Sequence, residues 1–229
     1  MTAGAGARGT ASPLLVAVCT GRRERRGVRG SANPLERPWE SAIFKTAVAG
    51  PVRVLATRLD GDEQADQRVH GGAEKAVLAY GAGHYPAWRE ELALPDLTFG
   101  AFGENLAIAG LDESSVAVGD VLAVGSARLR VSQPRGPCAK LARRFGRADI
   151  VERVLTTRRT GFYLRVVEQG VVAAGQQVAV VDRPFATLPI ALVLRVLHEK
   201  PFDRDAAERL AACPALAPDL RSYLAAKLA

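Results

Sequence analysis

The sequence predicts a mainly β domain with short helical insertions, followed by a small module of three helices. Between residues 14 and 183, short runs rich in β-branched residues are separated by glycine- or aspartate-containing turns. After Arg183-Pro184 the pattern changes to alanine- and leucine-rich segments with helical spacing. The length of 229 residues suits one full-sized domain with an appendage. The residues alone therefore favour a mainly antiparallel barrel or sandwich carrying a helical module.

Eight runs are expected to be strands because each is short, apolar and bounded by turn-forming residues. Helical insertions are predicted at 84–92, which is amphipathic around Trp88, and at 138–145, continuing over 149–158 after a break at Gly146. The predicted strands are 14–19, 52–57, 75–80, 105–108, 121–124, 127–132, 161–167 and 177–181.

The two ends of the chain differ from this central domain, 14–183. Residues 1–13 are small and rich in glycine and alanine, so we expect them to be disordered. In 184–229, Thr187-x-Pro189 opens a first helix and Asp203 or Asp205 caps a second. Pro218 starts the third helix. A module of this size is expected to pack on the barrel or on a second subunit, which makes a homodimer plausible.

The positive charge is concentrated near the N-terminus. Residues 1–37 contain seven arginines and two glutamates, which account for +5 of the formal net charge of +7. The arginine run 22–26 has no interleaved aromatic residues and belongs to no nucleic-acid-binding motif. We interpret it as a solvated loop, and nucleic-acid binding ranks last among the functions considered.

Cysteine usage and hydropathy point to the cytoplasm. The three cysteines, Cys19, Cys138 and Cys213, are far apart and form no C-x-x-C pair, which favours a reducing compartment and argues against a disulfide scaffold or a zinc ribbon. No apolar run approaches the ~20 residues that a membrane-spanning helix needs. The apolar stretch 14–19 is too short for a signal peptide, and the arginines follow it instead of preceding it.

The densest polar cluster lies between Gly61 and Lys75. Gly71 and Gly72 let the backbone turn sharply and approach a ligand closely, and Arg68, His70 and Lys75 could donate hydrogen bonds to an anion such as phosphate. Histidine does not recur at metal-ligand spacing. From the residues alone, a polar surface hairpin with solvated charges is the better interpretation.

A second cluster surrounds Cys138. Pro134 and Pro137 stiffen the segment that leads from a strand into a helix, and so determine where this cysteine points. The first turn of a helix, together with Arg135 and Lys140, favours the thiolate, which is both a nucleophile and a soft metal ligand. This setting favours a functional role for Cys138, whereas the other two cysteines are expected to be buried and structural.

Two further groups are ambiguous on their own. Glu104 and Asn105 could bind a heterocycle or cap a turn. Arg165 could add positive charge to the same site, whereas Arg158 and Arg159 fit a solvated surface better.

Taken in order, these residues resemble the MOSC family, and within it the bacterial YiiM-type members. The resemblance covers most of residues 14–183, and the C-terminal helices resemble the three-helix module of YiiM-type proteins. Two features depart from the family pattern: Ala73 replaces a usual proline, and residues 1–37 are longer and more basic. The matching segments are 41–45, 50–52, 59–66, 70–72, 75–77, 84–86, 102–106, 118–120, 132–135 and 137–138.

The resemblance implies a MOSC-type β-barrel that binds the molybdenum cofactor, a pterin dithiolene with a phosphate. Cys138 would be the catalytic residue and molybdenum ligand of an oxidoreductase that reduces N-hydroxylated compounds such as 6-hydroxylaminopurine or amidoximes. The alternative is a sulfur carrier or cofactor sulfurase with a persulfide on Cys138. The implied cofactor-binding residues are Lys45, Arg68, His70, Gly71, Gly72, Lys75, Asn105, Arg135, Lys140 and Arg165.

The expected partners follow from the same resemblance. The chain has no room for a pyridoxal-phosphate desulfurase domain and lacks the cysteines of an iron–sulfur ferredoxin domain. We therefore expect an external reductase as the electron donor and a small N-hydroxylated substrate, with no membrane partner.

Overall fold

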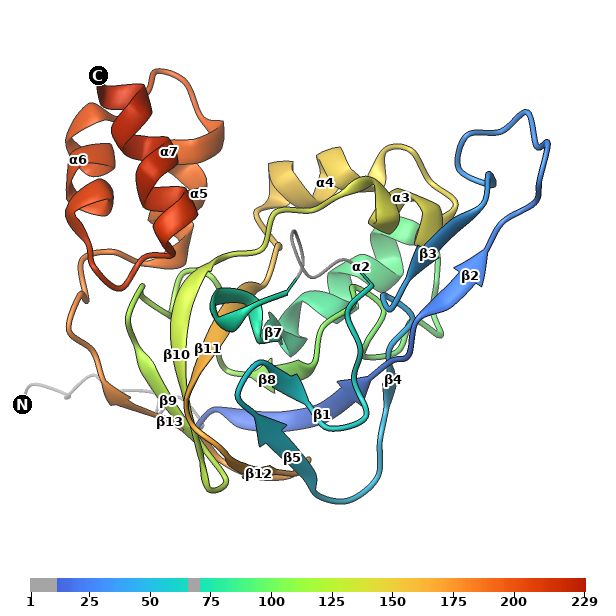
Figure 1. The fold of residues 1–229 in the computed structure, drawn as a ribbon, viewed down its shortest axis with the longest axis horizontal. Coiled ribbons are helices and arrows are strands. Elements are labelled where there is room, and N and C mark those ends of the chain that lie inside the picture. Colours follow the sequence, from blue (N-terminus) through green and yellow to red (C-terminus); the bar gives the residue numbers. More distant parts are fainter. Residues whose placement is uncertain (1–11, 66–70) are drawn as a thin grey trace, which may run out of the picture.

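An eight-stranded sheet dominates the fold (Figure 1). The computed structural model describes residues 12–65 and 71–229, and the following statements concern those residues. Along the sheet, the strand order is β13-β9-β10-β11-β7-β8-β1-β4, with antiparallel pairs except for the parallel pair β7–β8. The strands are β1 (Leu14–Thr20), β4 (Thr46–Ala47), β7 (Val77–Gly81), β8 (Leu106–Ala109), β9 (Val121–Val124), β10 (Ala127–Pro134), β11 (Phe162–Glu168) and β13 (Val178–Asp182).

The predicted closed barrel is not confirmed. Closing the barrel would require β1 to pair with β13. The start of β1 makes only an isolated bridge there, between Leu14 and Gln177, and single backbone hydrogen bonds such as Leu15 N to Gln176 O at 2.9 Å. The rest of β1 pairs with β8 and β4, so no ladder joins β1 to β13. The sheet therefore ends at β4 and β13, although the mainly β character with helical insertions is confirmed.

Two small sheets contain the predicted strand at 52–57, which ends at Leu55, and four strands that the sequence did not predict. β5 (Val52–Leu55) lies between β12 (Gly170–Val172) and β6 (Arg58–Leu59). β2 (Glu24–Arg26) pairs with β3 (Trp39–Ser41), and Arg25 faces Glu40 across the pair. The interpretation of 22–26 as a loop was therefore wrong for its second half, because a partner strand thirteen residues further on supplies the hydrogen bonds. We call residues 21–41 the arm.

Three helices pack beside the sheet around a second, aromatic core. They are α2 (Tyr85–Leu92), α3 (Ala139–Phe145) and α4 (Ile150–Thr157), each within two residues of its predicted bounds. Trp88 is fully buried, and Phe102 stacks on Tyr80 with ring centroids 4.9 Å apart. The aromatic side chains fill the space between these helices and the loop that precedes β8. No described helix is long and apolar enough to cross a membrane.

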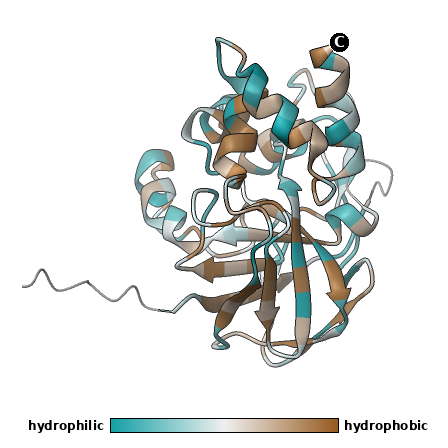
Figure 2. Cartoon of the chain, turned by 90° about the vertical axis from the view of Figure 1, so that its left-hand side faces the viewer, coloured by the Kyte–Doolittle hydropathy of each residue, from teal (hydrophilic) through white to brown (hydrophobic). Residues whose placement is uncertain are grey.

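The three-helix module follows as predicted. It consists of α5 (Ile190–His198), α6 (Arg204–Ala212) and α7 (Pro218–Leu228). Asp203 rather than Asp205 caps α6, because its Oδ1 accepts a hydrogen bond from Ala206 N at 3.0 Å. In Figure 2 the module's helices alternate between apolar and polar residues, as expected for helices that bury one face. The buried faces belong to the same apolar core as the sheet.

Candidate functional site

An open cavity lies where the end of the arm, the start of β7 and the segment between β10 and α3 meet. It contains about 620 Å³ of empty space, counted out to its mouth. Four basic side chains and two carboxylates are among the residues that line it. The sequence-predicted residues in this lining are Lys45, Lys75, Asn105, Arg135, Cys138 and Lys140.

Cys138 reaches the cavity because β10 ends at Pro134 and a short extended segment follows it. The backbone of Cys138 is itself extended (φ −130°, ψ 170°), and its carbonyl oxygen accepts a hydrogen bond from Leu141 N at 2.9 Å in the first turn of α3. The side chain is half-buried, whereas Cys19 and Cys213 are buried in the interior. Cys138 is the one cysteine of the three that lines the cavity.

Arg135 is a buried cation with an unused hydrogen-bond donor. The residue is 5% exposed, its Nη2 makes one long bond to Phe102 O at 3.4 Å, and its Nη1 has no partner within the described chain. A buried, unsatisfied charged donor costs free energy that a bound anion would recover. Arg135 therefore marks where an anionic group fits in this cavity.

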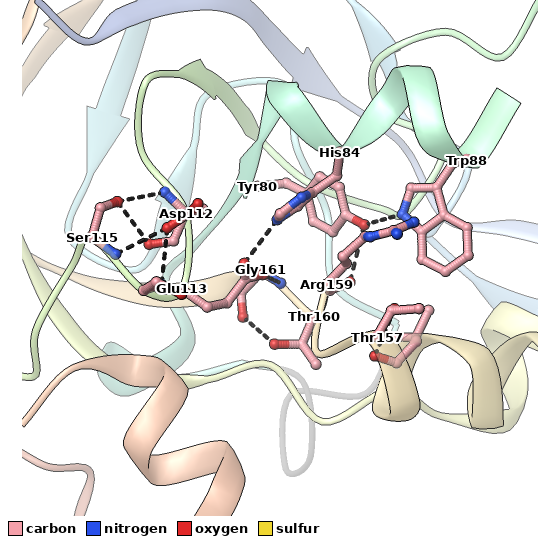
Figure 3. A network of polar contacts seen from close by, with 12 residues as sticks. Tyr80, His84, Trp88, Asp112, Glu113, Ser115, Thr157, Arg159, Thr160 and Gly161 are labelled. Carbon is pink, nitrogen blue, oxygen red and sulfur yellow. Dashed lines mark hydrogen bonds and ion pairs between the residues drawn. The ribbon is translucent and has the colours of Figure 1, made fainter. Parts of the chain in front are cut away.

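A polar network that joins His84, Glu113 and Gly161 (Figure 3) reaches the backbone of Arg135 through Gly161. Arg135 N donates to Gly161 O at 2.9 Å, and Gly161 N donates to Glu113 Oε1 at 2.6 Å. The second oxygen of Glu113 lies 2.8 Å from His84 Nε2. Gly161 has φ +76°, and a Cβ there would lie 2.6 Å from Ala79 O, so only glycine fits. The network is structural and keeps the start of β11 fixed behind the cavity.

The back wall of the cavity is a second buried network centred on Asp62. Its carboxylate is ion-paired with Lys45 and accepts hydrogen bonds from Gly21 N and Asn105 Nδ2, both at 2.9 Å. Asn105 Oδ1 also accepts a bond from Leu78 N at 3.1 Å. Burial lowers the pKa of Lys45, and Asp62 opposes that shift. Lys45 and Asn105 thus line the cavity, but their polar atoms bind the protein itself.

Sequence reasoning assigned no role to Asp62 or Tyr163, which both line the cavity. Burial raises the pKa of Tyr163, so its phenol Oη keeps its proton at neutral pH. Asp62 lies within the acidic stretch 59–66, and this concentration of carboxylates was the one feature of the sequence that could have indicated a role for it. Tyr163 lies two positions before Arg165 on β11, and residue spacing gave no signal for it, because Arg165 itself lies outside the lining.

Arg165 is not brought to the cavity lining. Its guanidinium is ion-paired with Glu74 and donates to Ala215 O at 3.3 Å, because β11 carries it toward the helical module. Gly71 and Gly72 also lie outside the lining. Arg68 and His70 lie outside the described residues. Among the described residues, no group of three His, Cys, Asp or Glu side chains could hold a metal ion.

Comparison with known families agrees with this layout. The MOSC domain model matches residues 66–179, which contain the Cys138 segment, and the YiiM-like 3-alpha helix domain model matches residues 188–229. A Bacillus subtilis relative, the uncharacterized protein YflK, is 40% identical over 80% of this chain and 82% of its own length. The chain belongs to the MOSC family.

Other MOSC relatives extend the comparison. Protein YiiM from Escherichia coli is 37% identical over 74% of this chain and 76% of its own. A protein from Gibberella moniliformis named reductase is 39% identical over 70% of this chain, which spans only 29% of that longer protein. The crystal structure of YiiM from Geobacillus stearothermophilus covers 95% of this chain with a TM-score of 0.78 and 32% identity, and all of that chain is covered.

Proposed function

We propose that this MOSC protein binds the molybdenum cofactor in the Cys138 cavity and reduces N-hydroxylated compounds such as 6-hydroxylaminopurine or amidoximes. The observation that carries this proposal is the buried, unsatisfied guanidinium of Arg135, which lines the same cavity as the half-buried Cys138. The reductase name of the fungal relative supports a reductive activity.

The residues present fit such a cofactor. Arg135, Lys75 and Lys140 suit the negative charge of a phosphate and a dithiolene. Cys138 offers a sulfur ligand of the soft type that binds such metals.

When bound, the cofactor would supply two-electron redox chemistry, with the net conversion of N–OH and two protons to N–H and water. The side chains of the cavity would bind the cofactor and orient it. Arg135 Nη1 would donate to an anionic group of the cofactor, and Tyr163 Oη keeps a proton that it can donate to a bound polar atom. The Lys45–Asp62 pair keeps the back wall fixed. Such preformed sites limit reorganisation during reaction.

The test is to purify the chain from a host that makes the cofactor and to measure molybdenum per chain. Wild type should retain molybdenum and reduce 6-hydroxylaminopurine with reduced methyl viologen as donor. Cys138→Ala should lose activity, whereas Cys213→Ala, a buried cysteine outside the cavity, serves as the control. A metal-free wild type that leaves the substrate unchanged would refute the proposal.

The second candidate function is sulfur transfer, which the half-buried position of Cys138 in an open cavity favours. Here the thiolate would carry a persulfide received from a separate desulfurase. Mass spectrometry after incubation with a desulfurase and cysteine distinguishes the two functions. A one-sulfur mass increase on Cys138, without bound molybdenum, would favour the carrier.

A further inference from the structure

A strongly basic surface lies beside the cavity. It consists of the arm, residues 21–41, and the segment 138–149, which together contain ten basic and four acidic side chains, or +6 of the chain's formal +7. The two segments touch, because Arg143 Nη1 donates to Arg37 O at 3.2 Å and the Arg143 guanidinium lies 5.8 Å from the Trp39 ring. In Figure 1 the arm extends away from the sheet beside α3. We call this the basic surface.

The basic surface is continuous with the cavity wall. β3 ends at Ser41, which lines the cavity together with Ile43, and α3 begins directly after Cys138. Directly before β2, the backbone N–H of Arg23 donates a hydrogen bond of 2.8 Å to Oε2 of Glu63, which also lines the cavity. A protein bound on the basic surface would therefore lie at the mouth of the cavity.

Some of its arginines are held in position and others carry uncompensated charge. The Arg26 and Arg144 guanidinium groups lie 4.2 and 5.0 Å from the centroid of the Phe44 ring. Arg22 and Arg29 are exposed and have no acidic partner within residues 12–65 and 71–229. Such an arrangement is preorganised to attract and orient an acidic surface.

We infer that the basic surface docks an acidic protein that carries a reduced flavin and delivers electrons to the Cys138 cavity. The inference rests on the proposed function, which consumes two electrons and two protons per N–OH bond cleaved. A flavin hydroquinone balances the reaction: it is oxidised to the quinone, losing two electrons and two protons, while R–NH–OH becomes R–NH₂ and water. Long-range attraction between opposite charges would speed this encounter.

The same surface suits nucleic acid less well. Binding of single strands relies on aromatic rings on which bases stack. Phe145 packs against Phe102 in the aromatic core, and the other two aromatic residues in or beside the basic surface, Trp39 and Phe44, are approached by guanidinium groups from Arg143, Arg26 and Arg144. The rings therefore serve to position arginines, and their faces are not presented as stacking platforms. The basic surface therefore offers positive charge for recognition, and an acidic protein docked beside the cavity would supply the complementary charge.

The test compares two electron donors with the full-length, cofactor-loaded chain. Reduced flavodoxin, an acidic flavoprotein, probes docking, and reduced methyl viologen supplies electrons without docking. The variant Arg22→Glu/Arg29→Glu should raise the KM for flavodoxin at least about tenfold at low salt, with an effect that shrinks as salt screens the charges. Its rate with methyl viologen should match wild type. The control, Arg204→Glu/Arg209→Glu, changes the same charge on exposed α6 positions.

The outcomes distinguish failure of the proposed function from failure of the docking inference. A wild type that is inactive with methyl viologen refutes the proposed function. A wild type that is active with methyl viologen but not with flavodoxin, or an equal loss in the control variant, overturns the docking inference alone. An unchanged KM for flavodoxin in the Arg22/Arg29 variant overturns it as well. Retention of DNA by wild type but not by this variant, without any effect on flavodoxin, would assign the basic surface to nucleic acid.

Discussion

Replacing Arg135 by methionine should make the ligand-free protein more stable while removing its affinity for anions. The guanidinium is 5% exposed, its Nη1 has no partner in the described chain, and its one side-chain bond is a long 3.4 Å contact to Phe102 O. Leaving a buried donor unsatisfied costs about 1–3 kcal/mol. Losing the weak bond to Phe102 O offsets part of this gain, so we expect Arg135→Met to add about 1–2 kcal/mol to the free energy of unfolding.

The assay is urea and thermal unfolding of the ligand-free protein, with and without added phosphate. In a chain of 229 residues, about 1–2 kcal/mol corresponds to an increase in Tm of roughly 2–8 °C. Phosphate should raise the Tm of wild type by mass action but leave Arg135→Met unchanged. Arg135→Lys, which keeps the charge, is the control and should gain little. A clear loss of stability in Arg135→Met would refute the reasoning, because it would mean that the guanidinium is already satisfied without a ligand.

The remaining predictions concern the interior. Asp62→Asn should cost about 3–5 kcal/mol in urea unfolding, because it leaves the Lys45 cation buried without its partner, and Lys45→Met/Asp62→Asn should recover part of that loss. Iodoacetamide at pH 8 should alkylate Cys138 in the folded protein but not Cys19, because burial raises the pKa of Cys19 to about 12. Since the folded-state pKa of Cys19 lies above its unfolded value, its contribution to stability is complete below about pH 8.5 and is lost as the pH rises toward 12. Cys19→Ala should therefore show a shallower loss of stability between these limits, and identical slopes would contradict this. Gly119→Ala should be destabilised, because φ is +86° and a Cβ would lie 2.8 Å from the Phe185 ring at the module junction.

The sequence predicted the long elements well because their signals are local. The strand at 121–124 was predicted to the residue, because Gly119-Asp120 and Gly125 bound its apolar run. The two-residue and three-residue strands, such as β2 and β3, were missed because hydrogen bonds to distant partners define them. The predicted strand at 75–80 begins later, at Val77, because residues 73–75 form a turn of 3₁₀ helix.

Part of the candidate site was also predicted, because that part is formed by residues that are close together in the sequence. Arg135, Cys138 and Lys140 are close in sequence, so one rigid segment brings them to the cavity. Whether Arg165 joins them depends on the register of β11 against β10, and this pairing contains two irregularities that residue spacing cannot reveal. The ion pair of Lys45 with Asp62 likewise depends on tertiary packing across seventeen residues.

The apolar core that the sheet and the three-helix module share determines whether the chain is expected to unfold in one step or in two. Two separate family models match residues 66–179 and 188–229, yet Leu129 and Val131 of β10 belong to the same buried cluster as Leu210 and Leu224 of the module. Ala217 N also bonds to Ser132 O at 3.1 Å across the boundary. Removing the module would expose β10 to water directly before Arg135 and Cys138. Because the two matched ranges share one apolar core, we expect the chain to unfold in a single cooperative transition.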